Sequence, residues 1–207
     1  MGSAVEFWFE FASTYSYPAA MRIEALARAA DVPLRWRAFL LGPIFAAQGW
    51  NDSPFNIYPA KGAYMWRDLE RICAAAGLAW RRPSAFPRGS LLAARIACAA
   101  AEEPWIGAFV RAVYGANFAA DQPIGEPAVV GEALRAAGVE PRPWLERGTG
   151  EAAKQALRAQ TDAAIARGVF GAPSCVVGGE LFWGNDRLEM AIAAARAPSG
   201  QASTGRA

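Results

Sequence analysis

The sequence predicts an α/β fold in which a mixed four-stranded sheet is interrupted by a long helical insertion. Three observations support this fold class. A strand–helix–strand pattern occupies about the first 40 of the 207 residues. Ala-rich helical patterns with few strand signals fill the middle of the chain, and a strand hairpin followed by a helix comes near its end.

The first strand is predicted at residues 5–11, where every odd position from Val5 to Phe11 is apolar and the even positions carry Glu or Trp. From residue 15 to residue 30 the apolar spacing becomes helical, and a second strand is predicted at residues 34–40. Because strand, helix and strand follow one another so closely, we expect the two strands to lie parallel.

The middle of the chain is predicted to be helical after one long loop. Residues 42–60 are rich in Gly, Pro and Asn, which is typical of a functional loop. Five helices are then predicted, at residues 62–76, 91–101, 104–114, 126–137 and 151–167.

The C-terminal part returns to strands. Strands are predicted at residues 174–177 and 180–183, because the Gly-Gly pair between them supplies the positive φ values of a tight hairpin turn. A last helix is predicted at residues 187–196. The small and polar residues 198–207 predict a disordered tail.

These units together form the pattern of a thioredoxin-like fold with an inserted all-helical domain. A βαβ unit, a helical insertion and a ββα unit give a mixed sheet with helices on its faces. We therefore expect a discontinuous thioredoxin-like domain at residues 1–41 and 168–197, and a helical insertion domain at residues 42–167.

Composition excludes several classes of function. The chain has 21 Lys and Arg against 19 Asp and Glu, and the basic residues are scattered, so we expect no nucleic-acid partner. It has no His, which excludes a Ser-His-Asp triad and a histidine metal ligand. No apolar run reaches the length of a membrane span and no secretory signal is visible, so we expect no membrane association.

The three cysteines are not expected to carry chemistry. Cys73, Cys98 and Cys175 are far apart in the sequence, which predicts neither a disulfide framework nor a metal site and is consistent with a reducing cytoplasm. Cys175 falls in a predicted core strand, where a free Cys behaves as a small buried hydrophobe.

Ser13 is the first candidate for chemistry, because it lies where the first strand gives way to the first helix. Unpaired N–H groups and the helix dipole favour an anion there, and a ligand's thiolate would be stabilised. Redox enzymes of the thioredoxin fold carry Cys-x-x-Cys at this place. Here it reads Ser13-Thr14-Tyr15-Ser16, so disulfide exchange is not expected. The alternative is that Ser13 or Thr14 only caps the helix.

Pro173, just before the third strand, is the second candidate. In a thioredoxin fold a proline at this place is typically cis, and the residue before it presents backbone groups to an extended peptide. The alternative is a trans proline that simply leads into the strand. The sequence leaves this isomer open.

Four stretches, in this order, resemble the signatures of 2-hydroxychromene-2-carboxylate isomerases and kappa-class glutathione transferases of the DsbA-like thioredoxin superfamily. They are residues 11–17 (Phe-Ala-Ser-Thr-Tyr-Ser-Tyr), 59–69, 168–173 and 182–188. The resemblance runs from about Val5 to Ala195, and the Trp-Gly-Asn-Asp-Arg-Leu stretch at 183–188 is closer to the isomerases. Thr14 departs from the pattern, since the family usually has Pro there.

The resemblance implies glutathione as the cofactor. Ser13 would contact its sulfur and favour the thiolate, and Ala172, before Pro173, would pair its backbone with the cysteinyl part. Three further roles are implied: Lys61 would meet a carboxylate, and Asn185 and Asp186 would bind the γ-glutamyl end. The alternatives are a solvated lysine and two helix caps. Two loop residues complete the candidate glutathione site: Asn51 and Asn56.

The implied activity is the interconversion of 2-hydroxychromene-2-carboxylate and trans-o-hydroxybenzylidenepyruvate, or of a related aromatic-degradation acid. Reversible thiolate addition would turn a double bond into a single one, allow rotation, and then restore it. The aromatic part of the substrate would need apolar walls, for which the candidates are Trp50, Phe55, Tyr58 and Phe86. By analogy with the family we also expect a homodimer.

Two other functions remain open from the residues. A kappa-like glutathione transferase would use the same Ser13 site but would consume glutathione by conjugating it to electrophiles. A thioredoxin-fold binding protein without catalysis would not bind glutathione. A disulfide oxidoreductase is disfavoured, because the Cys pair is missing.

Overall fold

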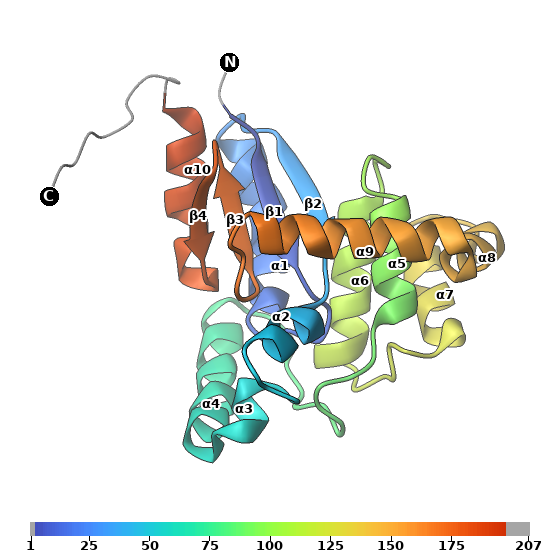
Figure 1. Ribbon diagram of the computed structural model, residues 1–207, viewed down its shortest axis with the longest axis horizontal. Coiled ribbons are helices and arrows are strands. Elements are labelled where there is room, and N and C mark those ends of the chain that lie inside the picture. Colours follow the sequence, from blue (N-terminus) through green and yellow to red (C-terminus); the bar gives the residue numbers. More distant parts are fainter. Residues whose placement is uncertain (1–2, 198–207) are drawn as a thin grey trace, which may run out of the picture.

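A computed structural model describes residues 3–197 (Figure 1). The predicted disordered tail at 198–207 lies outside the described residues. A single four-stranded sheet has the order β2-β1-β3-β4. The pair β1–β2 is parallel, whereas β3 runs antiparallel to both β1 and β4. The predicted mixed sheet is confirmed, with strands at Val5–Phe9 (β1), Leu34–Ala38 (β2), Ser174–Val177 (β3) and Glu180–Trp183 (β4).

Helices account for most of the remaining described chain. The crossover between β1 and β2 is α1 (Ser16–Ala29), and the hairpin β3–β4 is followed by a short 3₁₀ helix η1 (Asn185–Arg187) and α10 (Leu188–Arg196). Between β2 and β3 lie α2 (Leu41–Ala47), α3 (Pro54–Ile57), α4 (Pro59–Ala75), α5 (Leu91–Ala99), α6 (Ile106–Phe118), α7 (Pro127–Ala136), α8 (Pro141–Thr149) and α9 (Glu151–Ala166).

The prediction of one long loop at residues 42–60 is wrong, since α2, α3 and the start of α4 occupy it. The prolines that indicated a loop begin helices instead: Pro54 and Pro59 stand in first turns, where a missing N–H costs nothing. Ser53 caps α3 by accepting a hydrogen bond from Phe55 N. The helix α8 was missed for the same reason, because Pro141 starts it.

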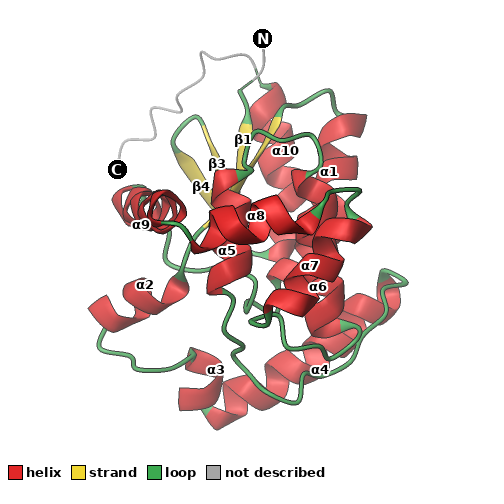
Figure 2. Ribbon diagram, turned by 90° about the vertical axis from the view of Figure 1, so that its right-hand side faces the viewer, coloured by secondary structure: helices red, strands yellow, loops and turns green. Residues whose placement is uncertain are grey.

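Both faces of the sheet are covered. Residues of β1 alternate as predicted: Phe7 and Phe9 belong to the larger core, whereas Trp8 lies in a second cluster on the other face. The larger core includes side chains of α1 and α10, and the second cluster includes Ala164 of α9. Figure 1 shows α9 passing in front of the sheet, and Figure 2 shows the same elements after a quarter turn.

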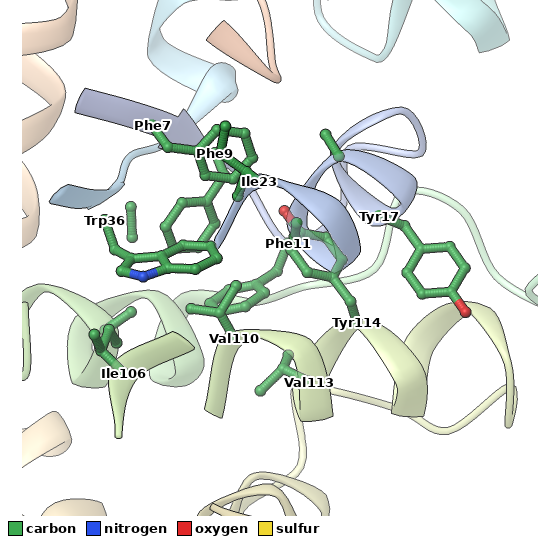
Figure 3. Close-up of a cluster of buried hydrophobic side chains, with 14 of the residues drawn as sticks. Phe7, Phe9, Phe11, Tyr17, Ile23, Trp36, Ile106, Val110, Val113 and Tyr114 are labelled. Carbon is green, nitrogen blue, oxygen red and sulfur yellow. The ribbon is translucent and has the colours of Figure 1, made fainter. Parts of the chain in front are cut away.

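Aromatic side chains join the sheet to the helical segment (Figure 3). Phe11, just beyond β1, lies 5.3 Å from both Phe9 and Tyr114 of α6, measured between ring centroids. Phe9 also meets Trp36 of β2 edge to face. Pairs of this kind contribute about 0.5–1.5 kcal/mol each beyond their buried area. The core therefore runs from the sheet into α6, and the division into two domains stays a prediction.

Candidate active site

A cavity of about 1130 Å³ opens at the end of the sheet where β1 and β4 stop and β3 begins. One side of it, the sheet wall, is formed by residues 10–15, 170–173 and 183–187. The opposite side, the loop wall, is formed by residues 41–55. Side chains from α4 and residues 86–87 complete the lining. Figure 1 shows α2, α3 and α4 gathered beyond this end of the sheet.

Ser13 lies in the turn between β1 and α1 and faces this cavity. Its N–H donates to the Glu10 carbonyl at 2.9 Å, and its hydroxyl donates to the Ala172 carbonyl at 2.9 Å. The helix begins at Ser16 with no side-chain cap. Because neither Ser13 nor Thr14 caps α1, the capping alternative does not explain Ser13.

Thr14, where the sequence departs from the signature that it resembles, has a structural use. It is fully buried, and its hydroxyl donates to the sulfur of Met65 on α4 at 3.0 Å. The neighbouring Tyr15 hydroxyl donates to Asp68, also on α4, at 3.0 Å. These two contacts tie the residues just before α1 to α4.

The Ala172–Pro173 peptide bond, whose isomer the sequence left open, is cis. Ala172 accepts the Ser13 hydroxyl, and the Pro173 carbonyl accepts the N–H of Gly184 at 2.9 Å. Residues far apart in the chain therefore meet at one point of the sheet wall, with the backbone of residue 172 at the cavity surface.

Gly184 sets the start of η1 and the place of Asp186. Its φ of +119° favours glycine, and a Cβ there would lie 2.5 Å from an Asp186 carboxylate oxygen. Asn185 is held by Arg22, which donates to its carbonyl at 3.2 Å. The side-chain oxygen of Asn185 is buried and has no hydrogen-bond partner among residues 3–197. Since the caps of η1 and α10 use no side chain, the helix-cap alternative does not apply to Asn185 or Asp186.

Lys61 also lies on the cavity, in the first turn of α4. Its ammonium group stands 4.8 Å from the ring centroid of Tyr58, and none of the ion pairs found among residues 3–197 includes it. The cation is therefore available to an anionic ligand.

The remaining candidates divide into two groups. The cavity is lined by Asn51, Trp50, Phe55 and Phe86, as predicted, but not by Asn56 or Tyr58. Asn56 donates to the Asp52 carboxylate at 3.0 Å and to the Phe86 carbonyl at 3.2 Å. Tyr58 packs beside Trp50 with centroids 6.4 Å apart. These two residues support the lining rather than form it.

Sequence reasoning missed several lining residues. Glu10 directly follows β1, and its Oε1 accepts hydrogen bonds from Ala12 N and the Ser90 hydroxyl. Burial raises the pKa of its carboxyl, and the hydrogen bonds only partly offset this. Burial, reinforced by the Asp68 carboxylate, also raises the pKa of Tyr15. The feature of the sequence that could have identified Glu10 as a lining residue is its position three residues before Ser13.

An aromatic pair at the cavity edge was also missed. Phe170 and Trp183 are both about half exposed, and their centroids are 4.9 Å apart. Gly171 allows this placement, since a Cβ there would lie 2.5 Å from the indole nitrogen of Trp183. The sheet wall therefore contributes apolar surface of its own.

The cysteines lie away from this cavity and are not activated. Burial raises the pKa of Cys73 to about 11 and those of Cys98 and Cys175 to about 12, so all three thiols are protonated at neutral pH. Within the described part of the chain no group of His, Cys, Asp and Glu residues could hold a metal ion. No described helix has both the length and the apolar character needed to cross a membrane.

Known proteins resemble this chain in sequence and in fold. The model of the DSBA-like thioredoxin domain matches residues 4–194. The chain is 33% identical over 196 residues to 2-hydroxychromene-2-carboxylate isomerase of Pseudomonas putida, covering 90% of this chain and 91% of that protein. Identity to the enzyme of the same name from Pseudomonas sp. (strain C18) is 32% over 196 residues, covering 90% and 87%.

A solved structure of 2-hydroxychromene-2-carboxylate isomerase superimposes with a TM-score of 0.80 at 30% identity, covering 92% of this chain and 93% of that chain. The thioredoxin-like fold and the resemblance read from the four motifs are thus both confirmed. The chain belongs to the DSBA-like thioredoxin family and, within it, to the 2-hydroxychromene-2-carboxylate isomerases.

Proposed function

We propose that this protein is a glutathione-dependent isomerase that interconverts 2-hydroxychromene-2-carboxylate and trans-o-hydroxybenzylidenepyruvate, or a closely related aromatic acid. Membership of the family supports isomerisation as the reaction class. The observation that carries the dependence on glutathione is the Ser13 hydroxyl, which lies at the entry to α1 and against the Ala172 carbonyl, on the cavity surface.

Size supports two ligands in one cavity. Pockets for single small molecules usually have volumes of about 300–1000 Å³. A volume of about 1130 Å³ leaves room for a tripeptide along the sheet wall and an aromatic acid against the loop wall.

Ser13 can exchange one hydrogen bond for two when glutathione binds. A hydroxyl has a single proton and rotates freely about its C–O bond. Turned away from Ala172, it can donate to the glutathione sulfur. The freed Ala172 carbonyl can then accept the cysteinyl N–H, as one strand pairs with another. The hydroxyl and the N-terminus of α1 both favour the thiolate over the thiol, whose free pKa is about 8.5.

The ends of the tripeptide find matching groups. The buried and unpaired Asn185 side-chain oxygen can accept from the γ-glutamyl end, and the Asp186 carboxylate can meet its ammonium group. Lys61 can bind a carboxylate, and Asn51 can supply a further hydrogen bond from the loop wall. We assign Asn56 to holding the loop wall, because its amide is already bonded to Asp52 and Phe86.

When bound, glutathione supplies a thiolate that adds reversibly to a conjugated carbon of the substrate, so that the double bond becomes single, rotates and is restored. The chain's part is to hold the thiolate at Ser13 and to present the aromatic ring with apolar surface from Trp50, Phe55 and Phe86. Water is excluded by the same surface. The homodimer and the cytoplasmic location stay predictions.

Isothermal titration with glutathione tests this function. We expect the wild-type protein to bind glutathione. We expect Ser13→Ala to raise the pKa of the bound glutathione thiol, which is measured from the absorbance of the thiolate. Loss of one hydrogen bond to a charged group, about 1.5–3 kcal/mol, should lower kcat by about 10–150-fold. Thr149→Ala, which removes an exposed hydroxyl bonded to the Glu146 carbonyl, is the control.

Turnover of trans-o-hydroxybenzylidenepyruvate with glutathione below the substrate concentration completes the test. An isomerase leaves the glutathione concentration unchanged, whereas a transferase consumes it. Failure of the wild type to bind glutathione would contradict the proposal.

A further inference from the structure

Glu10 is a cavity-lining carboxyl with an asymmetric hydrogen-bond pattern. Its Oε1 accepts from Ala12 N at 3.2 Å and from the Ser90 hydroxyl at 3.0 Å. Its Oε2 makes no hydrogen bond to any residue in the range 3–197, and Glu10 joins none of the ion pairs in that range. The protein thus holds one carboxyl oxygen in place, and the other can form a hydrogen bond with a ligand in the cavity.

Burial shifts Glu10 toward its protonated form, against the smaller opposing effect of its two hydrogen bonds. On the α6 side the Tyr114 hydroxyl donates to the Glu10 carbonyl at 2.9 Å, and burial keeps that phenol neutral by raising its pKa. On the α5 side the neighbour is the neutral Ser90. The charged groups that share the cavity are Lys61, Asp52, Asp68, Asp186 and Arg187. Burial is the largest influence on Glu10, and it raises the pKa of the carboxyl.

The other carboxyl groups and the phenol that line the cavity are already engaged. Asp68 accepts the hydrogen bond of the Tyr15 hydroxyl, so the Tyr15 proton is already engaged. Asp52 accepts hydrogen bonds from Ser53 N and from the Asn56 amide. Asp186 pairs with Arg187 at 2.9 Å. Lys61 is exposed and stacked on Tyr58. Among these lining groups, Glu10 is the carboxyl whose pKa is raised by burial and whose second oxygen accepts no hydrogen bond within residues 3–197.

The proposed reaction needs a proton donor of this kind. When the double bond of an α,β-unsaturated keto acid becomes single, an electron pair moves onto the carbonyl oxygen. A positioned donor stabilises that charge, and general acids of this type contribute about 10²–10⁴-fold to a rate. The chain contains no His to fill this role.

We propose that Glu10 is a catalytic acid, which donates the proton on its Oε2 to the substrate carbonyl oxygen. The inference rests on the proposed function. As the thiolate sulfur bonds to the conjugated carbon, the electron pair of the double bond forms a new double bond to the carbonyl carbon. The π pair of the carbonyl becomes the bond between that oxygen and the Glu10 proton, and Glu10 is left as a carboxylate. When the double bond is restored after rotation, the same proton returns to Oε2. Nothing is consumed, and no further reactant is required.

Two measurements on Glu10→Gln test this role. The amide keeps an oxygen for Ala12 and Ser90, so the fold is preserved, but it has no acidic proton. We expect kcat for trans-o-hydroxybenzylidenepyruvate to fall by about 100-fold or more, while the Kd for glutathione changes by less than about threefold, since Glu10 touches the substrate. Glu132→Gln, an exposed carboxyl on α7, is the matched control.

The pH dependence provides a readout that a structural role would not give. The carboxyl groups can be followed by NMR in protein labelled with ¹³C-Glu, where the Glu10 signal is the one missing from the spectrum of Glu10→Gln. We expect this carboxyl to titrate with a pKa above the ordinary value of about 4.3. The wild-type kcat should fall as the pH rises through that pKa, and this limb should be absent in Glu10→Gln. Ser90→Ala should move the titration of the Glu10 carboxyl and the fall in kcat to higher pH, because the Ser90 hydrogen bond lowers the pKa of Glu10.

The outcomes separate the two proposals. A wild-type protein that binds no glutathione contradicts the proposed function. A wild-type enzyme that isomerises the substrate while Glu10→Gln keeps its full kcat contradicts only the role of Glu10. A Glu10 carboxyl that titrates at or below about 4.3 does the same.

Discussion

The two walls of the cavity are held in different ways. On the sheet wall, hydrogen bonds join residues far apart in the chain: Ser13 to Ala172, and Gly184 to Pro173. On the loop wall, most of the bonds are local, as from Ser53 N to Asp52 and from Phe55 N to Ser53. The sheet wall is therefore fixed by the fold as a whole, whereas the loop wall depends on a few neighbouring residues.

Because of this difference, we expect the two walls to bind different ligands. In the proposed function glutathione is the constant ligand, and a wall fixed by long-range contacts suits such a ligand. In that function the aromatic acid is the other ligand, and a wall built from local turns can change by substitution without disturbing the sheet. Hydrogen bonds from Tyr15 to Asp68 and from Thr14 to Met65 attach α4 to the sheet wall. Lys61, which lies on α4, is therefore held with the sheet wall.

The largest effect that distinguishes the walls is expected from Gly184→Ala. The substitution forces an unfavourable φ and drives a Cβ against Asp186, at a cost of about 1–3 kcal/mol. We expect the Kd for glutathione, measured by titration calorimetry, to rise by about 5–150-fold. The matched control is Gly178→Ala, which has a φ of +57° but no atom within 4 Å of the new Cβ. Equal losses of affinity in the two variants would show that strain alone, and not the sheet wall, is responsible.

Much of the sheet wall was predictable because its signals are local in sequence. The change from period two to helical spacing located Ser13, and the hairpin preceded Asn185 and Asp186. Glu10 could not be assigned, since alternation only placed it on the face opposite Phe9. Its burial depends on Ser90, which is 80 residues away. The loop wall was predicted less well, because Pro54 and Pro59 suggest loops by composition and helix starts only in context.

A smaller effect, on substrate binding rather than on glutathione binding, is expected from Trp50→Ala on the loop wall. Trp50 lines the cavity and packs on Phe45 with centroids 5.7 Å apart. Loss of its apolar surface, about 1–2 kcal/mol, should raise the KM for the aromatic acid by about 5–30-fold. The Kd for glutathione should stay within about twofold of wild type. Steady-state kinetics with calorimetry on the same samples checks both values. A loss confined to glutathione binding would reverse the assignment of the walls.

The smallest effect is expected from Asn56→Ala, and it is the most direct test of which wall binds glutathione. Asn56 is exposed and bonds to Asp52 and Phe86 rather than lining the cavity. We expect its loss to lower the free energy of unfolding, measured by urea denaturation, by less than about 1 kcal/mol and to leave the Kd for glutathione unchanged. Asn51→Ala, which removes an amide that does line the cavity, should weaken glutathione binding by a few-fold at most, about 1 kcal/mol. If Asn56→Ala instead abolished glutathione binding while Gly184→Ala did not, the loop wall would hold the tripeptide, and the long-range contacts around Ser13 would serve the fold alone.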